Sequence, residues 1–250
     1  MFNIKKVQRA RKILSYITNF LFKLFQLNLR YKENRKEYGV EIFEYFYLPW
    51  KKDEDFINYF SKIENFTINP MSRLYTIYEY SKFYLKENST FVEVGSWKGG
   101  VSGLIALSNN DKNIDIFSCD TFTGVKNSTN KDSFFQNDEY NEASTKDIKD
   151  LESLVGTKIN IVEGVFPDSF KDIELNKPLS MAHIDVDTYL SAKESFEFLS
   201  SIIIKNGLII LDDYGGWFTD GITEFGNELK KDDNYYVVPN HIGQLIIFKK

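Results

Sequence analysis

Two short segments combine a run of apolar residues with closely spaced carboxylates. One reads His183-Ile184-Asp185-Val186-Asp187 and the other reads Leu211-Asp212-Asp213-Tyr214. Carboxylates brought together without a partner repel one another and raise each other's pKa, and a hard divalent cation with oxygen ligands removes that conflict. The pattern predicts a metal site formed by Asp185, Asp212 and Asp213. In the competing interpretation these residues cap a turn and pair with a lysine, which we disfavour because carboxylates seldom follow apolar strands unpaired.

A glycine-rich segment at residues 93–100 has the composition of a cofactor-binding turn. Gly95 permits a tight turn after an apolar strand, and Gly99 with Gly100 allows a ligand close to the backbone. The spacing G-x-x-x-G-G differs from the G-x-G-x-x-G of dinucleotide sites, and the carboxylate of Glu93 would repel a pyrophosphate. The turn suits S-adenosylmethionine, which has an amino-acid end and free hydroxyls. The residues predicted to bind it here are Glu93, Gly95, Ser96, Trp97 and Gly99. A purely structural turn is the alternative.

Further cofactor-binding positions follow later strands. Asp120 ends a predicted strand, where an acidic side chain accepts hydrogen bonds from ribose hydroxyls in nucleotide-binding folds. Gly164 gives access to the backbone, and Phe166 offers a ring for an adenine face. With Asp168, which closes the same segment, these residues are predicted to complete the cofactor site. Ordinary turns and caps are the competing interpretation.

The metal is expected to be Mg²⁺ or Mn²⁺. One cysteine and two histidines leave carboxylates as the main available ligands, and oxygen ligands suit these hard cations. Methyl transfer is an in-line displacement, so a protein mainly positions and deprotonates the acceptor. A bound metal serves that purpose because it binds a hydroxyl, lowers its pKa and orients it toward a methyl donor. His183 is expected to be a buried core histidine.

Strands and helices alternate from residue 91 onward. Apolar runs predict strands at 91–94, 114–119, 159–162, 181–184 and 207–211, and helical spacing predicts helices from 101, at 144–155 and at 191–204. Residues 235–238 and 244–248 are predicted to form a closing antiparallel pair. The expected fold class is therefore a Rossmann-like α/β fold with a mostly parallel sheet and helices on both faces. In such a sheet, ligands bind beyond the carboxyl ends of the strands.

The sequence predicts three regions. Residues 1–36 form a basic amphipathic N-terminal extension with ten basic residues and one acidic residue. Residues 37–90 form a helical, aromatic-rich region, with its clearest helix at 72–87 and Ser72 as the N-cap. Residues 91–250 form the cofactor-binding catalytic core. The extension has two open interpretations, a helix on an anionic membrane surface or a helix that packs on the core or on a partner subunit.

Composition excludes several classes of protein. The net charge of −5 argues against nucleic acid as a partner. The apolar run in the extension is interrupted by polar residues, so it is predicted to be neither a signal peptide nor a spanning helix. The single cysteine fits a cytoplasmic protein, with membrane association left open. The missing G-K-[ST] and G-x-G-x-x-G signatures disfavour nucleotide hydrolases and NAD-dependent dehydrogenases.

From about residue 71 to the C-terminus, the chain resembles the macrocin O-methyltransferase (TylF-like) family of sugar O-methyltransferases. The similar segments agree in order and spacing and lie at residues 71–74, 93–100, 119–124, 163–169, 183–191 and 207–215. The chain departs from the family at Lys98, Val186, Ala192 and Asn206, none of which is a proposed ligand. Residues 1–70 match poorly. The resemblance implies that this region helps to shape the acceptor pocket, so residues 37–90 are expected to form a cap on the acceptor side, and the acceptor stays undefined.

The resemblance implies a class I methyltransferase fold with S-adenosylmethionine as the methyl donor. It also implies Mg²⁺ bound at Asp185, Asp212 and Asp213, with Asp185 taking part in deprotonating a sugar hydroxyl. We expect an O-methyltransferase that acts on a glycan or on a nucleotide-activated sugar. A catechol-type small-molecule enzyme is one alternative. A non-catalytic cofactor-binding subunit is another, although it would not need three clustered carboxylates.

The expected partners follow from the same observations. The acceptor is a sugar, and the basic extension favours an anionic acceptor or a membrane-linked glycan. Residues 1–30 are the segment that would contact a membrane surface. A homodimer is expected from the family and from the aromatic residues of the N-terminal region.

Overall fold

The computed structural model describes residues 48–134 and 139–250. The predicted extension at residues 1–36, its membrane contact and residues 37–47 lie outside the described residues. Within the part of the chain that is described, no helix is both long enough and apolar enough to cross a membrane. Leu48–Lys250 is one compact unit, and the division of the chain at residues 36 and 90 stays a prediction.

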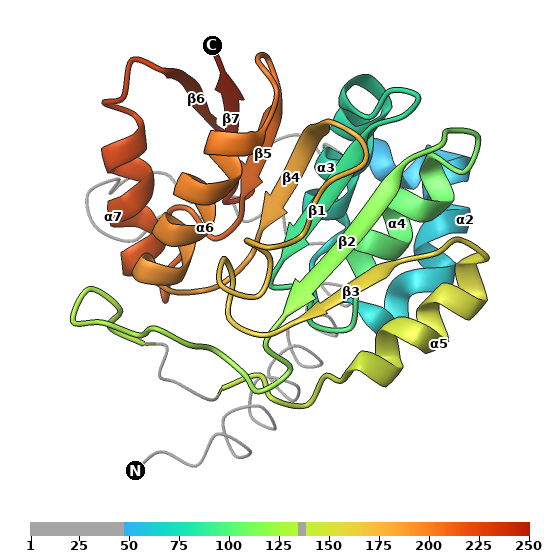
Figure 1. Cartoon of the computed structure of the whole chain (residues 1–250), viewed down its shortest axis with the longest axis horizontal. Helices are drawn as coiled ribbons and strands as arrows, with labels where there is room; N and C mark the ends of the chain where they lie inside the picture. Colours follow the sequence, from blue (N-terminus) through green and yellow to red (C-terminus); the bar gives the residue numbers. More distant parts are fainter. Residues whose placement is uncertain (1–47, 135–138) are drawn as a thin grey trace, which may run out of the picture. The chain divides into compact units, whose positions relative to one another are not determined.

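A seven-stranded sheet with the order β3-β2-β1-β4-β5-β7-β6 runs through this unit (Figure 1). Strands β1 to β5 are parallel to one another, whereas β7 is antiparallel to both β5 and β6. The strands are Thr90–Val94 (β1), Asp115–Asp120 (β2), Asn160–Glu163 (β3), Leu179–Ile184 (β4), Leu208–Leu211 (β5), Tyr235–Pro239 (β6) and Leu245–Lys249 (β7). The predicted fold class, mostly parallel with a C-terminal antiparallel pair, is confirmed.

Helices cover both faces of the sheet, and each face has its own core. On one face lie Glu54–Ile63 (α2), Met71–Tyr84 (α3), Gly100–Ser108 (α4) and Thr145–Val155 (α5), with the short 3₁₀ turns Pro49–Lys51 (η1) and Glu64–Phe66 (η2). On the other face lie Tyr189–Ile202 (α6) and Asp220–Leu229 (α7). Successive strand residues point to opposite faces. Phe91 therefore packs with the first group and Val92 with the second.

Local sequence signals explain where several helices begin and end. Asp53 caps α2 by accepting a hydrogen bond from the Phe56 amide at 2.9 Å. Ser144 forms a capping box at the start of α5, which ends at Gly156 in the left-handed conformation. The predicted N-cap of α3 at Ser72 is wrong. This helix begins at Met71, because Pro70 is suited to the position just before a helix and lacks the amide that a helix interior needs.

The parallel register brings the carboxyl ends of four strands to one level. Val94 of β1 lies beside Cys119 of β2 and beside Ile184 of β4, which in turn lies beside Leu211 of β5. The residues that follow these positions, Gly95, Asp120, Asp185 and Asp212, therefore share one edge of the sheet. Connections leave in opposite directions between β1 and β4, which is where open α/β sheets bind ligands.

Gly95 makes this close arrangement of strand ends possible. Its φ is +83°, and a Cβ atom added to it would lie 1.9 Å from the carbonyl oxygen of Asp185. The Gly95 amide donates a hydrogen bond to the carbonyl of Cys119 at 2.9 Å. Any side chain here would push β1 away from β4 at the level of the acidic residues.

We expect Gly95→Ala to destabilise the protein far more than Gly156→Ala. Gly156 has a φ of +71° and open space around its Cβ position, so alanine there incurs only the left-handed backbone penalty of about 1–2 kcal/mol. At Gly95 the clash with Asp185 adds to that penalty, giving about 3 kcal/mol or more. Urea unfolding of both variants measures the difference. Equal losses of stability would contradict the tight packing of β1 on β4.

Candidate functional site

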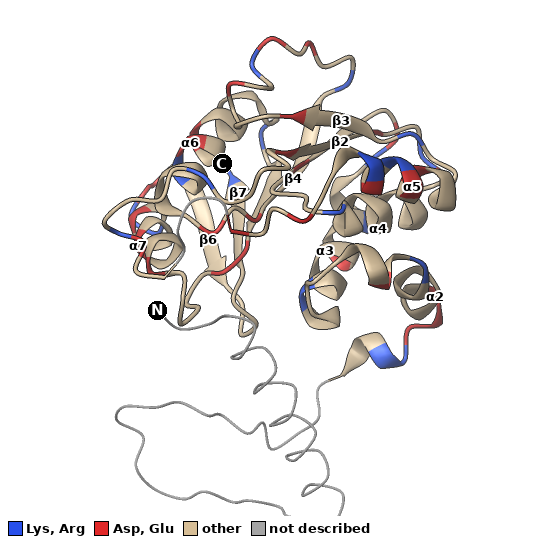
Figure 2. Ribbon diagram, turned by 90° about the horizontal axis from the view of Figure 1, so that it is seen from below, with Lys and Arg blue, Asp and Glu red and all other residues tan. Residues whose placement is uncertain are grey.

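A cavity of about 510 Å³ opens at the carboxyl ends of β1, β2 and β4. Its walls come from the glycine-rich turn after β1, the loops after β2, β3, β4 and β5, and the segment from η2 to the start of α3. Of the residues predicted to form the site, the cavity is lined by Glu93, Gly95, Ser96, Trp97, Asp120, Gly164, Phe166, Asp185 and Asp213. In the view of Figure 2, acidic residues colour several loops around the middle of the molecule.

Asp120 organises the turns on the cofactor side of the cavity. One of its carboxylate oxygens accepts a hydrogen bond from the Trp97 amide at 2.7 Å, and the other accepts from the Phe122 amide at 2.8 Å. Burial raises its pKa, although these backbone hydrogen bonds oppose the rise. Each carboxylate oxygen has a second lone pair, so Asp120 can still accept hydrogen bonds from a ligand.

Buried polar groups on the turn after β1 lack partners within the described part of the protein. The hydroxyl of Ser96 and the indole N–H of Trp97 are both buried and make no hydrogen bond there. Both residues line the cavity. Because buried polar groups are normally hydrogen-bonded, these two are suited to a polar ligand such as the amino-acid end of S-adenosylmethionine.

Glu93 is fully buried beneath this turn. One of its oxygens accepts hydrogen bonds from the amide of Ser102 at 2.9 Å and from its hydroxyl at 2.5 Å. Burial raises the pKa of Glu93 to about 7. Glu93 therefore ties β1 to α4, and its second oxygen lies 3.9 Å from Nδ1 of His183.

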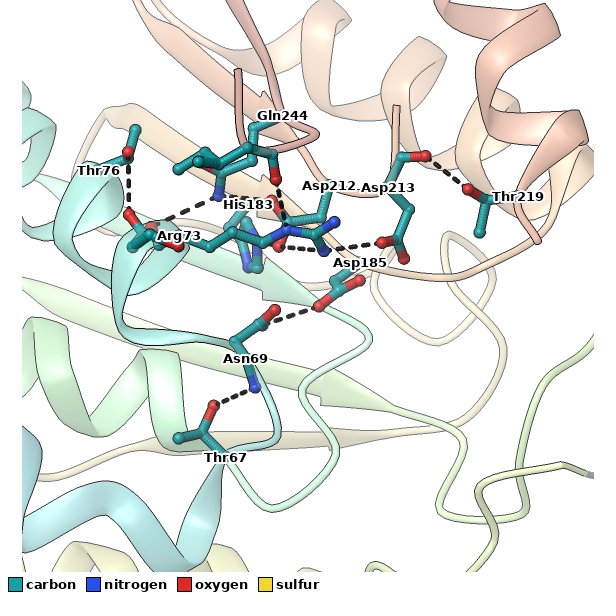
Figure 3. A network of polar contacts seen from close by, with 12 residues as sticks. Thr67, Asn69, Arg73, Thr76, His183, Asp185, Asp212, Asp213, Thr219 and Gln244 are labelled. Atoms are coloured by element: carbon teal, nitrogen blue, oxygen red, sulfur yellow. Dashed lines mark hydrogen bonds and ion pairs between the residues drawn. The ribbon is translucent and has the colours of Figure 1, made fainter. Parts of the chain in front are cut away.

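Three carboxylates face the cavity beside β4 and β5. Asp185, Asp187 and Asp213 have oxygen atoms within 4.8 Å of one another. Asn69 donates a hydrogen bond to Asp185 at 3.0 Å, and Arg73 donates one to Asp213 at 2.7 Å (Figure 3). Asp187 was not among the ligands predicted from the sequence, but it faces the cavity together with Asp185 and Asp213. These three carboxylates and Asp212 are called the acidic group below.

Asp212 lies beneath these three residues and does not line the cavity. Its Oδ1 accepts a hydrogen bond from the side chain of Gln244 at 2.6 Å. Its Oδ2 lies 3.3 Å from Nε2 of His183, an ion-pair distance, but no hydrogen bond forms there. Asp212, His183 and Asp185 also have side-chain atoms within 4.8 Å of one another. Asp185 therefore belongs to both groups, whereas Asp213 belongs to the group that faces the cavity and Asp212 to the buried one.

Burial and mutual repulsion raise the pKa of the carboxyls that face the cavity. For Asp185, burial comes first and the charges of Asp212 and Asp213 follow, which together raise its pKa to about 8. For Asp187, burial again comes first, followed by Asp185 and Asp213, and its pKa lies well above 3.8. With a pKa of about 8 and no cation in front of it, Asp185 favours the protonated form at neutral pH.

Two cationic side chains oppose this repulsion. Burial lowers the pKa of His183, but its interactions with Asp212 and the charges of Asp185 and Glu93 together outweigh burial and raise that pKa to about 9. Burial raises the pKa of Asp212, yet His183 and Arg73 together hold it below its ordinary value. Asp212 is therefore kept ionised. His183 is a buried core residue, as expected, and its contact with Asp212 places it beside the acidic group as well.

The acidic group fits a hard divalent cation. Several carboxylate oxygens converge within 4.8 Å, and Oδ2 of Asp212 is buried without a hydrogen-bond partner among the described residues. Oxygen ligands at this density suit Mg²⁺ or Mn²⁺. Asp185, Asp212 and Asp213 would hold such an ion, and Asp187 is close enough to join them.

Two residues predicted to bind cofactor lie away from the cavity. Asp168 has a side chain that is 79% exposed and pairs with Lys171 at 2.9 Å, outside the cavity lining. Gly99 precedes α4 with a φ of +84°, and a Cβ there would meet the side chain of Ile148 at 2.6 Å. Gly99 therefore serves the packing of α4 on α5, while the neighbouring Gly100 lines the cavity.

Besides Asp187, four residues of the site were not predicted from the sequence. Asn69 and Arg73 reach the acidic group from outside the sheet, and Gln244 reaches it from the turn before β7. Trp217, with 81% of its surface exposed, stands at the mouth of the cavity. Only Arg73 carried a signal, because it is the sole arginine from residue 48 to the C-terminus.

Comparison with known proteins shows the family to which the chain belongs. The family model described as macrocin-O-methyltransferase (TylF) matches residues 82–244. Among curated protein sequences, none matches the chain.

Solved structures share the fold at low sequence identity. The O-methyltransferase NovP has a TM-score of 0.63 at 17% identity, over 74% of this chain and 82% of its own. The calicheamicin methyltransferase CalS11 has a TM-score of 0.60 at 14% identity, over 78% and 84%. The S-adenosylhomocysteine-bound methyltransferase PaMTH1 from Podospora anserina has a TM-score of 0.57 at 11% identity, over 85% and 100%.

In EDTA, we expect the free energy of unfolding to fall as the pH rises from 5 to 8. Asp185, with its pKa raised from 3.8 to about 8, and Glu93, with its pKa raised from 4.5 to about 7, hold more protons in the folded than in the unfolded state in this range. Stability then decreases with pH. Asp185→Asn removes one of these groups. At pH 8 the free energy of unfolding of the variant should therefore be higher than that of the wild type by on the order of 1 kcal/mol.

Urea unfolding at several pH values checks this expectation. Asp168→Asn is the matched control, because its carboxylate is exposed and lies outside the acidic group. A wild-type profile that rises with pH, or an Asp185→Asn profile that coincides with it, would contradict the electrostatics described for the site.

Proposed function

Because this chain belongs to the macrocin-O-methyltransferase (TylF) family, we propose that it methylates a hydroxyl group of a sugar with the help of a divalent metal ion. The chain is an S-adenosylmethionine-dependent O-methyltransferase. The observation that carries the proposal is the row of Asp185, Asp187 and Asp213 facing the same cavity as the glycine-rich turn. That juxtaposition would put a proton acceptor and ion ligands beside the methyl donor.

The turns after β1, β2 and β3 would hold the cofactor. Asp120 would accept hydrogen bonds from ribose hydroxyls, and the amino-acid end would lie against Gly95 and Ser96. Gly164 and Phe166 line the cavity beyond Asp120, which favours them as neighbours of the adenine ring. S-adenosylmethionine supplies a methyl group on a sulfonium, so the reaction breaks a carbon–sulfur bond and forms a carbon–oxygen bond.

The acidic group would bind the acceptor hydroxyl and take up its proton. A divalent ion held by Asp185, Asp212 and Asp213 would lower the pKa of a hydroxyl placed against it. Asp185 was predicted to take part in deprotonation. Asp187 shares the cavity and the raised pKa, and it is not one of the predicted ion ligands. We therefore propose that Asp187 acts together with Asp185 as the proton acceptor.

The mouth of the cavity supports a sugar as the acceptor. Trp217 and Phe218 line it next to the carboxylates, with their rings 6.5 Å apart. Carboxylates that hydrogen-bond hydroxyls, next to aromatic rings that pack on an apolar ring face, suit the two faces of a pyranose. A sugar on a glycan or on a nucleotide fits this arrangement equally well.

Other features of the enzyme stay proposals. A homodimer would show in the molar mass measured by light scattering. Contact of residues 1–30 with a membrane surface would show as binding to anionic vesicles. A cytoplasmic location is expected from the cysteine content alone.

An acceptor screen tests the proposal. With S-adenosylmethionine and Mg²⁺, we expect release of S-adenosylhomocysteine when nucleotide-activated hexoses or glycans are offered. EDTA should suppress turnover and Mn²⁺ should restore it. Asp185→Asn and Asp187→Asn should each lower turnover by about 100-fold or more, the range of general-base catalysis. Asp168→Asn, outside the cavity, should leave turnover unchanged.

The alternatives predict different results in the same screen. If the protein methylates catechols but no sugar, the acceptor is an aromatic diol and not a sugar. Turnover that survives EDTA would contradict the role of a metal. Tight binding of S-adenosylhomocysteine with no turnover on any acceptor would favour a non-catalytic cofactor-binding subunit.

A further inference from the structure

Arg73 is the one arginine between residue 48 and the C-terminus, where all the other long cationic side chains are lysines. It lies in the first turn of α3, outside the sheet, and lines the cavity. Its side chain is 17% exposed. Figure 3 shows its side chain extending across the site toward Asp213.

The guanidinium of Arg73 joins two separate segments. Nη1 donates a hydrogen bond to Oδ1 of Asp213 at 2.7 Å and lies 3.8 Å from Oδ2 of Asp212. Nε donates to the carbonyl oxygen of Ile242 at 2.9 Å. The turn packs closely on this group, since a Cβ added to Gly243 would lie 2.8 Å from Nη2. One side chain thus links the loop after β5 to the turn between β6 and β7.

The turn between β6 and β7 also contacts Asp212, through the side chain of Gln244. Gln244, two residues after Ile242, donates a hydrogen bond to Oδ1 of Asp212 at 2.6 Å and a long one, 3.5 Å, to the backbone carbonyl of Arg73. The side chain of Asn240 in turn donates to Oε1 of Gln244 at 2.9 Å, which fixes the orientation of its amide. Arg73 therefore orients Asp213 by a direct hydrogen bond. It orients Asp212 indirectly, by holding the turn that carries Gln244.

Lysine cannot replace these contacts. A guanidinium presents several donors in a rigid planar fork, so one side chain can satisfy a carboxylate and a carbonyl that lie in different directions. An ammonium group is a single point charge at the end of a flexible chain. A lysine at position 73 would keep the positive charge but would lose one of the two links.

We propose that Arg73 is a positioning residue that holds Asp212 and Asp213 in the orientation required to bind the divalent ion. This inference rests on the proposed metal site. The competing role is that of a simple counter-charge, which would neutralise the carboxylates and repel a metal ion. The two roles differ in sign: loss of a positioning residue weakens ion binding, whereas loss of a counter-charge strengthens it.

The affinity for Mn²⁺ separates these roles. It is measured by calorimetric titration of the full-length protein with Mn²⁺ in the presence of S-adenosylhomocysteine. We expect Arg73→Lys and Arg73→Met each to weaken Mn²⁺ binding by at least about tenfold. Lys82→Met is the matched control. Lys82 lies on the same helix and pairs with Glu79, away from the cavity, so its loss should leave Mn²⁺ affinity unchanged.

The affinity for S-adenosylhomocysteine shows that each variant is folded, because the Arg73 guanidinium bonds to Asp213, Asp212 and Ile242 and not to the turns after β1 and β2 that are proposed to hold this ligand. It should stay within about twofold of the wild-type value in all three variants. Tighter Mn²⁺ binding by Arg73→Met, with Arg73→Lys equal to wild type, would establish the counter-charge role and overturn the proposal. Equal affinity in wild type and both variants would overturn it too.

Failure of the underlying metal site gives a distinct result. Wild-type protein that binds S-adenosylhomocysteine but no Mn²⁺ would contradict the metal site, and the inference about Arg73 with it. Wild-type protein that binds Mn²⁺ with an affinity unaffected by Arg73 would contradict the inference alone.

Discussion

The gathering of negative charge at one edge of the sheet is the constraint on which the rest of this structure depends. Parallel strands of matched register place Asp185 and Asp212 side by side, and the loops after them add Asp187 and Asp213. Carboxylates this close cannot all ionise without nearby cations. The protein meets part of this demand with His183 from below and Arg73 from the side. The remaining charge is what makes the site suited to a divalent ion.

The same edge brings the acidic group next to the proposed place of the methyl donor. Gly95 allows β1 to lie against β4 with its backbone almost touching that of Asp185, so the turn after β1 and the carboxylates after β4 border one cavity. Asn69 and Arg73 close the other side from the segment before and within α3. The chemistry therefore depends on contacts between segments that are more than 100 residues apart in the sequence.

Local patterns in the sequence predicted the strands and the acidic residues that follow them. Residues that join the site only through tertiary contacts could not be predicted in this way. Apolar runs ending in acidic residues located β2, β4 and β5, and with them Asp120 and Asp185. The sequence offered no pattern for α7 at Asp220–Leu229, nor any way to pair Arg73 with Asp213. Asp168 was predicted from its place in a glycine-containing segment, but its turn points the side chain into solvent. Burial of Asp212 beneath the other three carboxylates also depends on Gln244, which only the folded β6–β7 turn brings near.

The most direct test of this account is a crystal structure of the protein grown with Mn²⁺ and S-adenosylhomocysteine, with anomalous scattering data collected at the manganese edge. We expect one strong anomalous peak among the carboxylates of Asp185, Asp212 and Asp213, with S-adenosylhomocysteine in the same cavity against the turn after β1. Bound S-adenosylhomocysteine with no peak at these aspartates, or with the ion held elsewhere, would contradict the central claim that this acidic edge is a metal-assisted methyl-transfer site.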